Sequence, residues 1–112
     1  MQKVEFFRHN IGRSEKRAVC QALDGLFLTT GKLVEQFEDR LAAYLGLHHA
    51  VGVTSCTGAL HLSLLAAGVG PGDEVITTPM TFAATALAVI QAGAKPVFVD
   101  VEPGTGNLDA RL

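Results

Sequence analysis

The sequence "AVGVTSCTGALHLSLLAAG" (residues 50–68) joins a β-branched run to a Leu-rich run through a short turn. Residues 50–54 are the kind of short apolar run that forms a buried strand. Residues 59–68 are Leu- and Ala-rich and end in glycine, which predicts a helix that ends at Gly68. The turn between them consists of small, hydrogen-bonding residues: Ser55, Cys56, Thr57 and Gly58.

The same alternation continues towards the C-terminus. We expect "EVITT" (74–78) to form a second strand, residues 82–93 a helix that is apolar nearly all round, and "KPVFVDV" (95–101) a third strand. Strands that alternate with helices predict a parallel sheet with right-handed crossovers. Because the strands lack polar alternation, we expect helices to cover both faces of the sheet, and the apolar helix to be buried on all sides. The fold class is therefore α/β.

The first half of the chain has a different pattern. Apolar residues recur at helical spacing after Ser14, a plausible N-cap, and again over residues 33–45, where Gly46 suits the C-terminal end. We therefore divide the chain into a helical segment, residues 1–49, and the start of an α/β domain, residues 50–112.

Composition limits the function classes. The formal net charge is −2 and no run of basic residues is present, which argues against nucleic acid or anionic lipid as a partner. No segment has the pattern of a signal peptide or of a membrane span, and two cysteines without a secretory signal are typical of reduced thiols, so a cytoplasmic location is expected. Hydrophobic residues make up 48% of the chain. A small domain with this apolar content is expected to be covered by another subunit or by further polypeptide.

The small-residue turn has two interpretations. Backbone N–H groups at a helix N-terminus lack intrahelical partners and lie at the positive end of the helix dipole, so they suit a phosphate or carboxylate. Ser55 and Thr57 add hydroxyl donors, and Gly58 permits close approach. Alternatively, Ser55 or Thr57 simply caps the helix. The residues alone favour neither interpretation.

Other chemistry-bearing residues have weaker signals. We interpret Cys56 as a small filler rather than a nucleophile. We do not expect His48 and His49 to share a metal ion, since neighbouring residues on a strand point to opposite faces. "GVGPGD" (68–73) is a turn rather than a dinucleotide fingerprint, because it follows a helix and precedes a strand. Asp100 is either a ligand group or, as we favour, a turn cap.

Three stretches together resemble the N-terminal part of the DegT/StrS family of nucleotide-sugar aminotransferases, which depend on pyridoxal 5′-phosphate (PLP) and have the aspartate-aminotransferase fold (fold type I). They are "LTTGKLVEQFEDRLAAYLG", "TSCTGALHLSLLAAGVGPGDEVITTPMTFAATALAVIQAGAKPVFVDV" and "TGNLD". The resemblance runs from about Phe7 to the last residue. It implies that the chain is part of the mostly parallel-sheet large domain, preceded by two helices.

The resemblance also implies site residues. The turn that binds the cofactor phosphate in relatives matches Ser55, Thr57 and Gly58, although Cys56 stands where glycine is common. Phe82 matches the aromatic residue that stacks on the pyridine ring. Thr30 and Gly31, in "LTTG", match a segment near the sugar site.

The implied reaction is amino transfer, with L-glutamate as the expected donor, to a nucleotide-linked ketosugar of polysaccharide or antibiotic sugar biosynthesis, in a homodimer. No lysine of this chain (Lys3, Lys16, Lys32, Lys95) stands in the family's Schiff-base context, which lies beyond residue 112, and no metal is implied. We therefore expect residues 1–112 alone to be inactive. The alternatives are a sugar dehydratase or deoxygenase of the same family, with His for Lys, and a non-catalytic α/β binding or assembly module.

Overall fold

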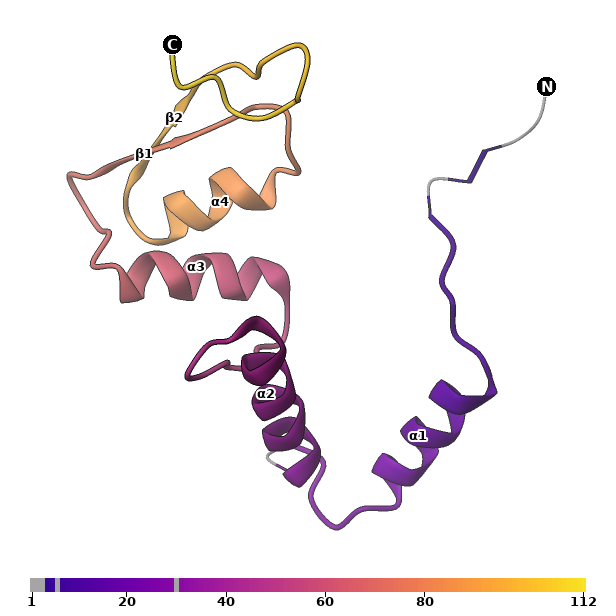
Figure 1. Cartoon of the computed structure of the whole chain (residues 1–112). Coiled ribbons are helices and arrows are strands. Elements are labelled where there is room, and N and C mark those ends of the chain that lie inside the picture. The colour runs from indigo at the N-terminus through magenta and orange to yellow at the C-terminus, as the bar shows by residue number, and fades with distance from the viewer. Residues whose placement is uncertain (1–3, 6, 30) are drawn as a thin grey trace. The chain divides into compact units, whose positions relative to one another are not determined.

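The computed structural model describes residues 4–5, 7–29 and 31–112, and its elements follow one another as α1, α2, α3, β1, α4 and β2 (Figure 1). The chain divides into two units, residues 1–52 and residues 53–112, called here the N-terminal and the C-terminal unit. Among the described helices, none combines the length and the apolarity needed to cross a membrane.

Helix α1 spans Arg13–Leu23 and begins differently from the prediction. Its N-cap is Gly12, not Ser14, because the Glu15 carboxylate reaches back to accept the Gly12 N–H at 2.6 Å. The Ser14 hydroxyl donates to the other Glu15 oxygen at 2.9 Å. The N–H of Glu15, the Ser14 hydroxyl and the Gly12 N–H lower the pKa of the Glu15 carboxyl below its ordinary value. A glutamate in the first turn therefore takes over the capping role that the sequence suggested for serine.

Helix α2 spans Lys32–Leu45 and confirms the predicted helix and its end. Gly46 adopts φ +67°, a left-handed conformation that glycine takes without a Cβ penalty. The N–H groups of Leu47 and Gly46 then donate to the carbonyls of Ala42 and Ala43, at 2.9 and 3.3 Å. These are the two bonds that close a Schellman motif.

The predicted strand over residues 50–54 is wrong: these residues form no strand in the structure. A strand needs the ladder hydrogen bonds of a neighbour, and no described residue pairs with this segment. The N–H of Gly52 instead donates to the Glu38 carboxylate of α2 at 2.6 Å.

The first element of the C-terminal unit is α3, Cys56–Ala66, which confirms the predicted helix but begins three residues earlier than expected and ends two residues before Gly68. The next turn is held by Asp73, whose carboxylate accepts the Gly70 N–H at 2.8 Å and whose own N–H donates to the Gly70 carbonyl at 3.1 Å. "GVGPGD" is thus a turn, as predicted, and it leads into β1, Glu74–Thr77.

Strands β1 and β2 (Lys95–Phe98) pair in parallel, in a register that sets Glu74 opposite Lys95 and Thr77 opposite Phe98. This confirms the parallel pairing predicted from the alternation of strands and helices. The side chains of Glu74 and Lys95 form an ion pair of 2.7 Å, and this hydrogen bond raises the pKa of the Lys95 ammonium. Beyond the strands, Val101 and Leu108 form a single antiparallel bridge.

Helix α4, Ala84–Gln91, crosses between the two strands and begins two residues later than predicted. It packs against both strands on one side and against α3 on the other, so that the sheet, α4 and α3 form successive layers (Figure 1). Ala88 and Val89 are buried there, and Ala92 and Ala94 complete the core with them.

The expectation that α4 is buried on all sides is wrong for the described residues. Leu87 and Ile90 remain 50% and 55% exposed, and Ile76 of β1 is 62% exposed. The expectation that another subunit or further polypeptide covers this apolar surface stays a prediction.

Candidate functional site

The Ser55–Gly58 turn lies at the N-terminus of α3, where Ser55 is the N-cap. Its backbone is extended (φ −161°, ψ 157°), and its hydroxyl oxygen accepts the Gly58 N–H at 3.0 Å. The Ala59 N–H donates to the Ser55 carbonyl at 3.0 Å, which begins the helical ladder. The capping interpretation of Ser55 is therefore confirmed, and the Ser55 hydroxyl keeps a proton that it can donate to a ligand.

Capping leaves two backbone donors in this turn. The N–H groups of Cys56 and Thr57 make no hydrogen bond to another described residue, whereas that of Gly58 is used by the cap. A Cβ on Gly58 would lie 3.3 Å from the Ser55 Oγ and 4.0 Å from the Thr54 Oγ1. A side chain at residue 58 would therefore crowd the cap. The turn presents two N–H groups and hydroxyls at the positive end of a helix, and this donor set fits a phosphate group.

Phe82 lies two residues before the start of α4 and is 83% exposed. Helices α3 and α4 begin on the same side of the C-terminal unit (Figure 1), so the Ser55–Gly58 turn and the Phe82 segment belong to one end of this layered unit. The carboxyl end of β1 leads directly into the Phe82 segment, which is where parallel α/β sheets bind ligands.

A groove of about 350 Å³ lies beside Phe82. It is lined by residues that follow β1, begin α4 or end β2: Thr78, Pro79, Thr81, Phe82, Ala83, Ala86, Leu87 and Phe98. The wall is mainly apolar with two threonine hydroxyls, which suits the face of a planar ring.

The structure adds two residues to this end that the sequence interpretation missed. The hydroxyl oxygens of Thr81 and Thr85 lie 3.0 Å apart and form a hydrogen bond, and the Thr85 N–H donates to the Phe82 carbonyl at 3.1 Å. The available signal was the spacing of four residues between the two threonines, which brings side chains together on a helix.

The predicted substrate residues lie in the N-terminal unit. Thr30 lies outside the described residues. Gly31 is the N-cap of α2, and a Cβ there would lie 2.8 Å from the Phe27 carbonyl oxygen. The absence of a side chain at residue 31 is therefore a packing requirement of the loop that precedes α2.

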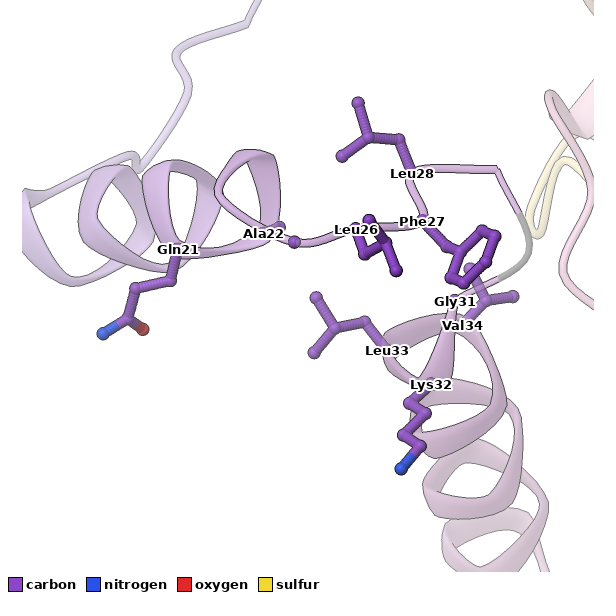
Figure 2. A pocket seen from close by; sticks show the side chains of 10 residues that line it. Gln21, Ala22, Leu26, Phe27, Leu28, Gly31, Lys32, Leu33 and Val34 are labelled. Atoms are coloured by element: carbon purple, nitrogen blue, oxygen red, sulfur yellow. The ribbon is translucent and has the colours of Figure 1, made fainter.

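Gly31 also lines an apolar pocket of about 390 Å³ between the end of α1 and the start of α2 (Figure 2). In Figure 2 the side chains of Leu26, Phe27 and Leu33 gather around this space, while the Lys32 ammonium points away from it. The two other described lysines, Lys16 and Lys95, lie in α1 and β2.

The other residues considered in the sequence make mainly local contacts. The rings of His48 and His49 are 6.5 Å apart and tilted by 49°, and among the described residues no group of three or more potential ligands could hold a metal ion. The Asp100 carboxylate accepts the N–H of Val101 at 2.8 Å, in keeping with a local turn role. Cys56 is an exposed free thiol.

Solved structures with the same fold define the class of protein. Spr1654 of Streptococcus pneumoniae in its PMP form superimposes with a TM-score of 0.90 and 35% identity, over 99% of this chain and 28% of that one. DesV of S. venezuelae superimposes with a TM-score of 0.81 and 43% identity, over 87% of this chain and 26% of that one. The fold is that of the PLP-dependent aminotransferases of fold type I, and Spr1654 is also known in a PLP form.

Within this fold, the sequence identifies the family of the chain. Residues 9–112 match the model of the DegT/DnrJ/EryC1/StrS aminotransferase family, and the chain belongs to this family. It is 50% identical over 99 residues to the spore coat polysaccharide biosynthesis protein SpsC of Bacillus subtilis, and the matched region covers 88% of this chain and 25% of SpsC. It is 43% identical over 98 residues to GDP-perosamine synthase of Caulobacter vibrioides, which covers 87% of this chain and 26% of that enzyme. The chain thus spans about a quarter of the length of these relatives.

Proposed function

We propose that residues 1–112 are the N-terminal segment of a PLP-dependent aminotransferase that transfers an amino group, with L-glutamate as donor, to a nucleotide-linked ketosugar. Family membership over residues 9–112 supports the reaction class. The name of GDP-perosamine synthase, one of the relatives, supports a nucleotide-linked sugar as substrate. The observation that carries the proposal within this chain is the Ser55–Gly58 turn, with its unpartnered N–H groups at the start of α3.

Each residue of the proposed cofactor site has a separate role. The N–H groups of Cys56 and Thr57 and the hydroxyls of Ser55 and Thr57 bind the phosphate of PLP. Gly58 keeps the cap free of a crowding side chain, and Phe82 offers its exposed ring to the pyridine. Thr30 and Gly31 belong to the sugar site in this proposal.

When bound, PLP supplies the electron sink for amino transfer. The residues of this chain hold and orient it, while the lysine that carries the cofactor and moves the proton lies outside residues 1–112. Residues 1–112 alone are therefore expected to transfer no amino group. The proposal includes a cofactor-binding domain that begins at residue 50, a homodimer and a cytoplasmic location.

The cofactor site is tested by exchanging the cap residue in the protein expressed from its complete gene. Ser55→Ala removes the cap and a phosphate donor, so PLP binding should weaken roughly three- to tenfold, with a loss of about 1 kcal/mol in stability. Ser55→Asp keeps a good N-cap but sets a carboxylate against the phosphate. Its melting temperature should stay near that of the wild type while PLP affinity falls by more than about tenfold, because like charges repel. Titration with PLP followed by absorbance measures the PLP affinities, and thermal unfolding measures the melting temperatures.

Ser14→Asp is the matched control, because it adds the same charge to the first turn of α1 in the other unit. It should leave PLP affinity unchanged. Equal PLP affinity for the wild type and Ser55→Asp would contradict the proposed phosphate site.

The reaction is tested with the same protein, L-glutamate and a series of nucleotide-linked ketosugars. Release of 2-oxoglutarate with an aminated sugar nucleotide supports the proposal. Dehydration or deoxygenation of the sugar without amino transfer would assign the chain to the alternative chemistry within the family.

A further inference from the structure

The segment between β1 and α4 carries Phe82 on a small network of hydrogen bonds. On one side of Phe82, the Thr81 hydroxyl bonds to the Thr85 hydroxyl at 3.0 Å. The Phe82 carbonyl itself accepts the Thr85 N–H at 3.1 Å. Thr85 therefore contacts the chain both at Phe82 and at the residue before it.

Packing does little to fix Phe82. Its side chain is 83% exposed, and the N-cap of α4, Ala83, provides no side-chain hydrogen bond to the helix end. An exposed aromatic residue next to an uncapped helix start has few contacts that select one orientation. The two bonds to Thr85 act directly at Thr81 and Phe82, whereas the other bonds of this segment lie on either side of them: the Met80 N–H donates to the Thr78 hydroxyl at 3.1 Å and the Leu87 N–H to the Ala83 carbonyl at 3.0 Å.

Thr85 is well anchored for this role. It is half-buried and lies one helical turn before Ala88 and Val89, which are 0% and 2% exposed and form the centre of the core. A residue on the same helical face as the core moves with the core. The hydrogen bonds of Thr85 therefore connect the rigid part of the C-terminal unit to the segment that presents Phe82.

We propose that Thr85 is a positioning residue that, through its bonds to Thr81 and Phe82, orients the Phe82 ring for stacking on the cofactor. The inference rests on the proposed function, in which Phe82 contacts the pyridine ring of PLP. Thr85 acts through Phe82 and does not itself touch the cofactor. Its hydroxyl holds the Thr81 side chain, and this sets the backbone direction from which Phe82 projects.

The test uses two variants of Thr85, one without and one with a hydroxyl, in the protein expressed from its complete gene. Thr85→Val removes the hydroxyl with little change of shape, and Thr85→Ser keeps it. Thr85→Val should weaken PLP binding roughly three- to tenfold, the range of one neutral hydrogen bond, and should alter the induced circular dichroism of bound PLP, which reports the orientation of its ring. Thr85→Ser should keep the PLP affinity and the induced dichroism of the wild type. A purely structural role would lower the melting temperature without changing the dichroism.

Thr105→Val is the matched control. It also removes a threonine hydroxyl that bonds a side chain, that of Glu102 at 2.8 Å, in a loop that does not line the groove. Its PLP affinity and dichroism should equal those of the wild type. Equal affinity and dichroism in Thr85→Val and the wild type, or failure of Thr85→Ser to restore them, would overturn the inference.

Thr81→Val breaks the same hydrogen bond from the exposed side, so it serves if Thr85→Val does not fold. It should reproduce the change in PLP binding, and the double variant should be no weaker than either single one, because both remove one shared interaction. An additive loss would overturn the inference. Failure of the wild-type protein to bind PLP would instead overturn the proposed function, so the two results are distinguishable.

Discussion

The two units of the chain are stabilised in different ways. In the N-terminal unit, Ala42 is the buried apolar residue among those described. The Glu15 cap of α1 and the Schellman end of α2 are local interactions, whereas the bond from Gly52 to Glu38 joins residues that are 14 apart. In the C-terminal unit, Ala88, Val89, Ala92 and Ala94 form a core between the sheet and α3.

This difference matters for function, because a binding site needs parts from distant residues held in fixed positions. The Ser55–Gly58 turn and the Phe82 segment both belong to the unit with the core. The proposed substrate residues belong to the unit in which Ala42 is the buried apolar residue among those described. Within this chain, a stable cofactor site is therefore expected to depend on the core of the C-terminal unit.

The largest expected effect comes from a charge in that core. Val89→Asp places an unpaired carboxylate at a position that is 2% exposed, so the free energy of unfolding of the C-terminal unit should fall by about 3–5 kcal/mol. Gln91→Asp, on an exposed position of the same helix, should change it by less than about 1 kcal/mol. Urea denaturation measures both. Equal effects of the two variants would show that the core does not stabilise this unit.

A smaller effect is expected at Gly31. Its Cβ would meet the Phe27 carbonyl oxygen at 2.8 Å, so Gly31→Ala should shift the loop before α2 and cost about 1–3 kcal/mol. Faster amide hydrogen exchange in the first turn of α2 is the expected sign. Gly104→Ala is the control in the other unit, since nothing lies within 4 Å of its Cβ. Unchanged exchange together with a raised KM for the sugar would assign Gly31 to substrate contact alone.

The two units also offer a matched pair of helix ends. Gly46 after α2 and Gly93 after α4 have φ +67° and +85°, so alanine at either position should cost about 1–2 kcal/mol. The cost should be greater at Gly93, where a Cβ would also lie 3.1 Å from the Pro71 Cγ, whereas nothing lies within 4 Å at Gly46. Thermal unfolding of the two variants checks the order, and the reverse order would contradict the close approach of Gly93 to Pro71.

The smallest effect concerns pH. Arg111 donates to the Asp109 carboxylate from its side chain at 2.8 and 2.7 Å and from its backbone at 3.0 Å, and these bonds lower the pKa of Asp109 below its ordinary value of 3.8. The resulting stabilisation is present above pH 3.8 and is lost as the pH falls through the lower pKa of the folded state.

Asp109→Asn should therefore lower stability at neutral pH and flatten its dependence between about pH 5 and about pH 2. Glu15→Gln is the counterpart in the N-terminal unit, where the lowered pKa has the same sign but arises from bonds within the first turn of α1. Its effect should be confined to hydrogen exchange in α1. An unchanged acid profile in Asp109→Asn would show that its ion pair does not contribute.

Prediction from sequence succeeded for several features whose determining interactions are local, although it placed the N-cap of α1 at Ser14 instead of Gly12. The helix over Lys32–Leu45 with its Gly46 end, the turn at Asp73 and the Ser55 cap of α3 depend on neighbours within a few residues. It failed for residues 50–54, because an apolar run indicates a strand but only a partner strand forms one. It also missed the bond between Thr81 and Thr85, because a spacing of four residues brings side chains together only where the backbone turns helically, and Thr81 precedes the start of α4.

The sequence by itself determined the family, the order of the elements from α3 onwards and the Ser55 cap, because periodicity, caps and turn residues act over short distances. The tertiary structure alone decided which side of α4 is buried, that Glu38 rather than a strand binds Gly52, and that the Phe82 segment shares an end of the unit with the α3 turn. These features depend on contacts between residues distant in the chain, and such contacts exist only once the layers have packed.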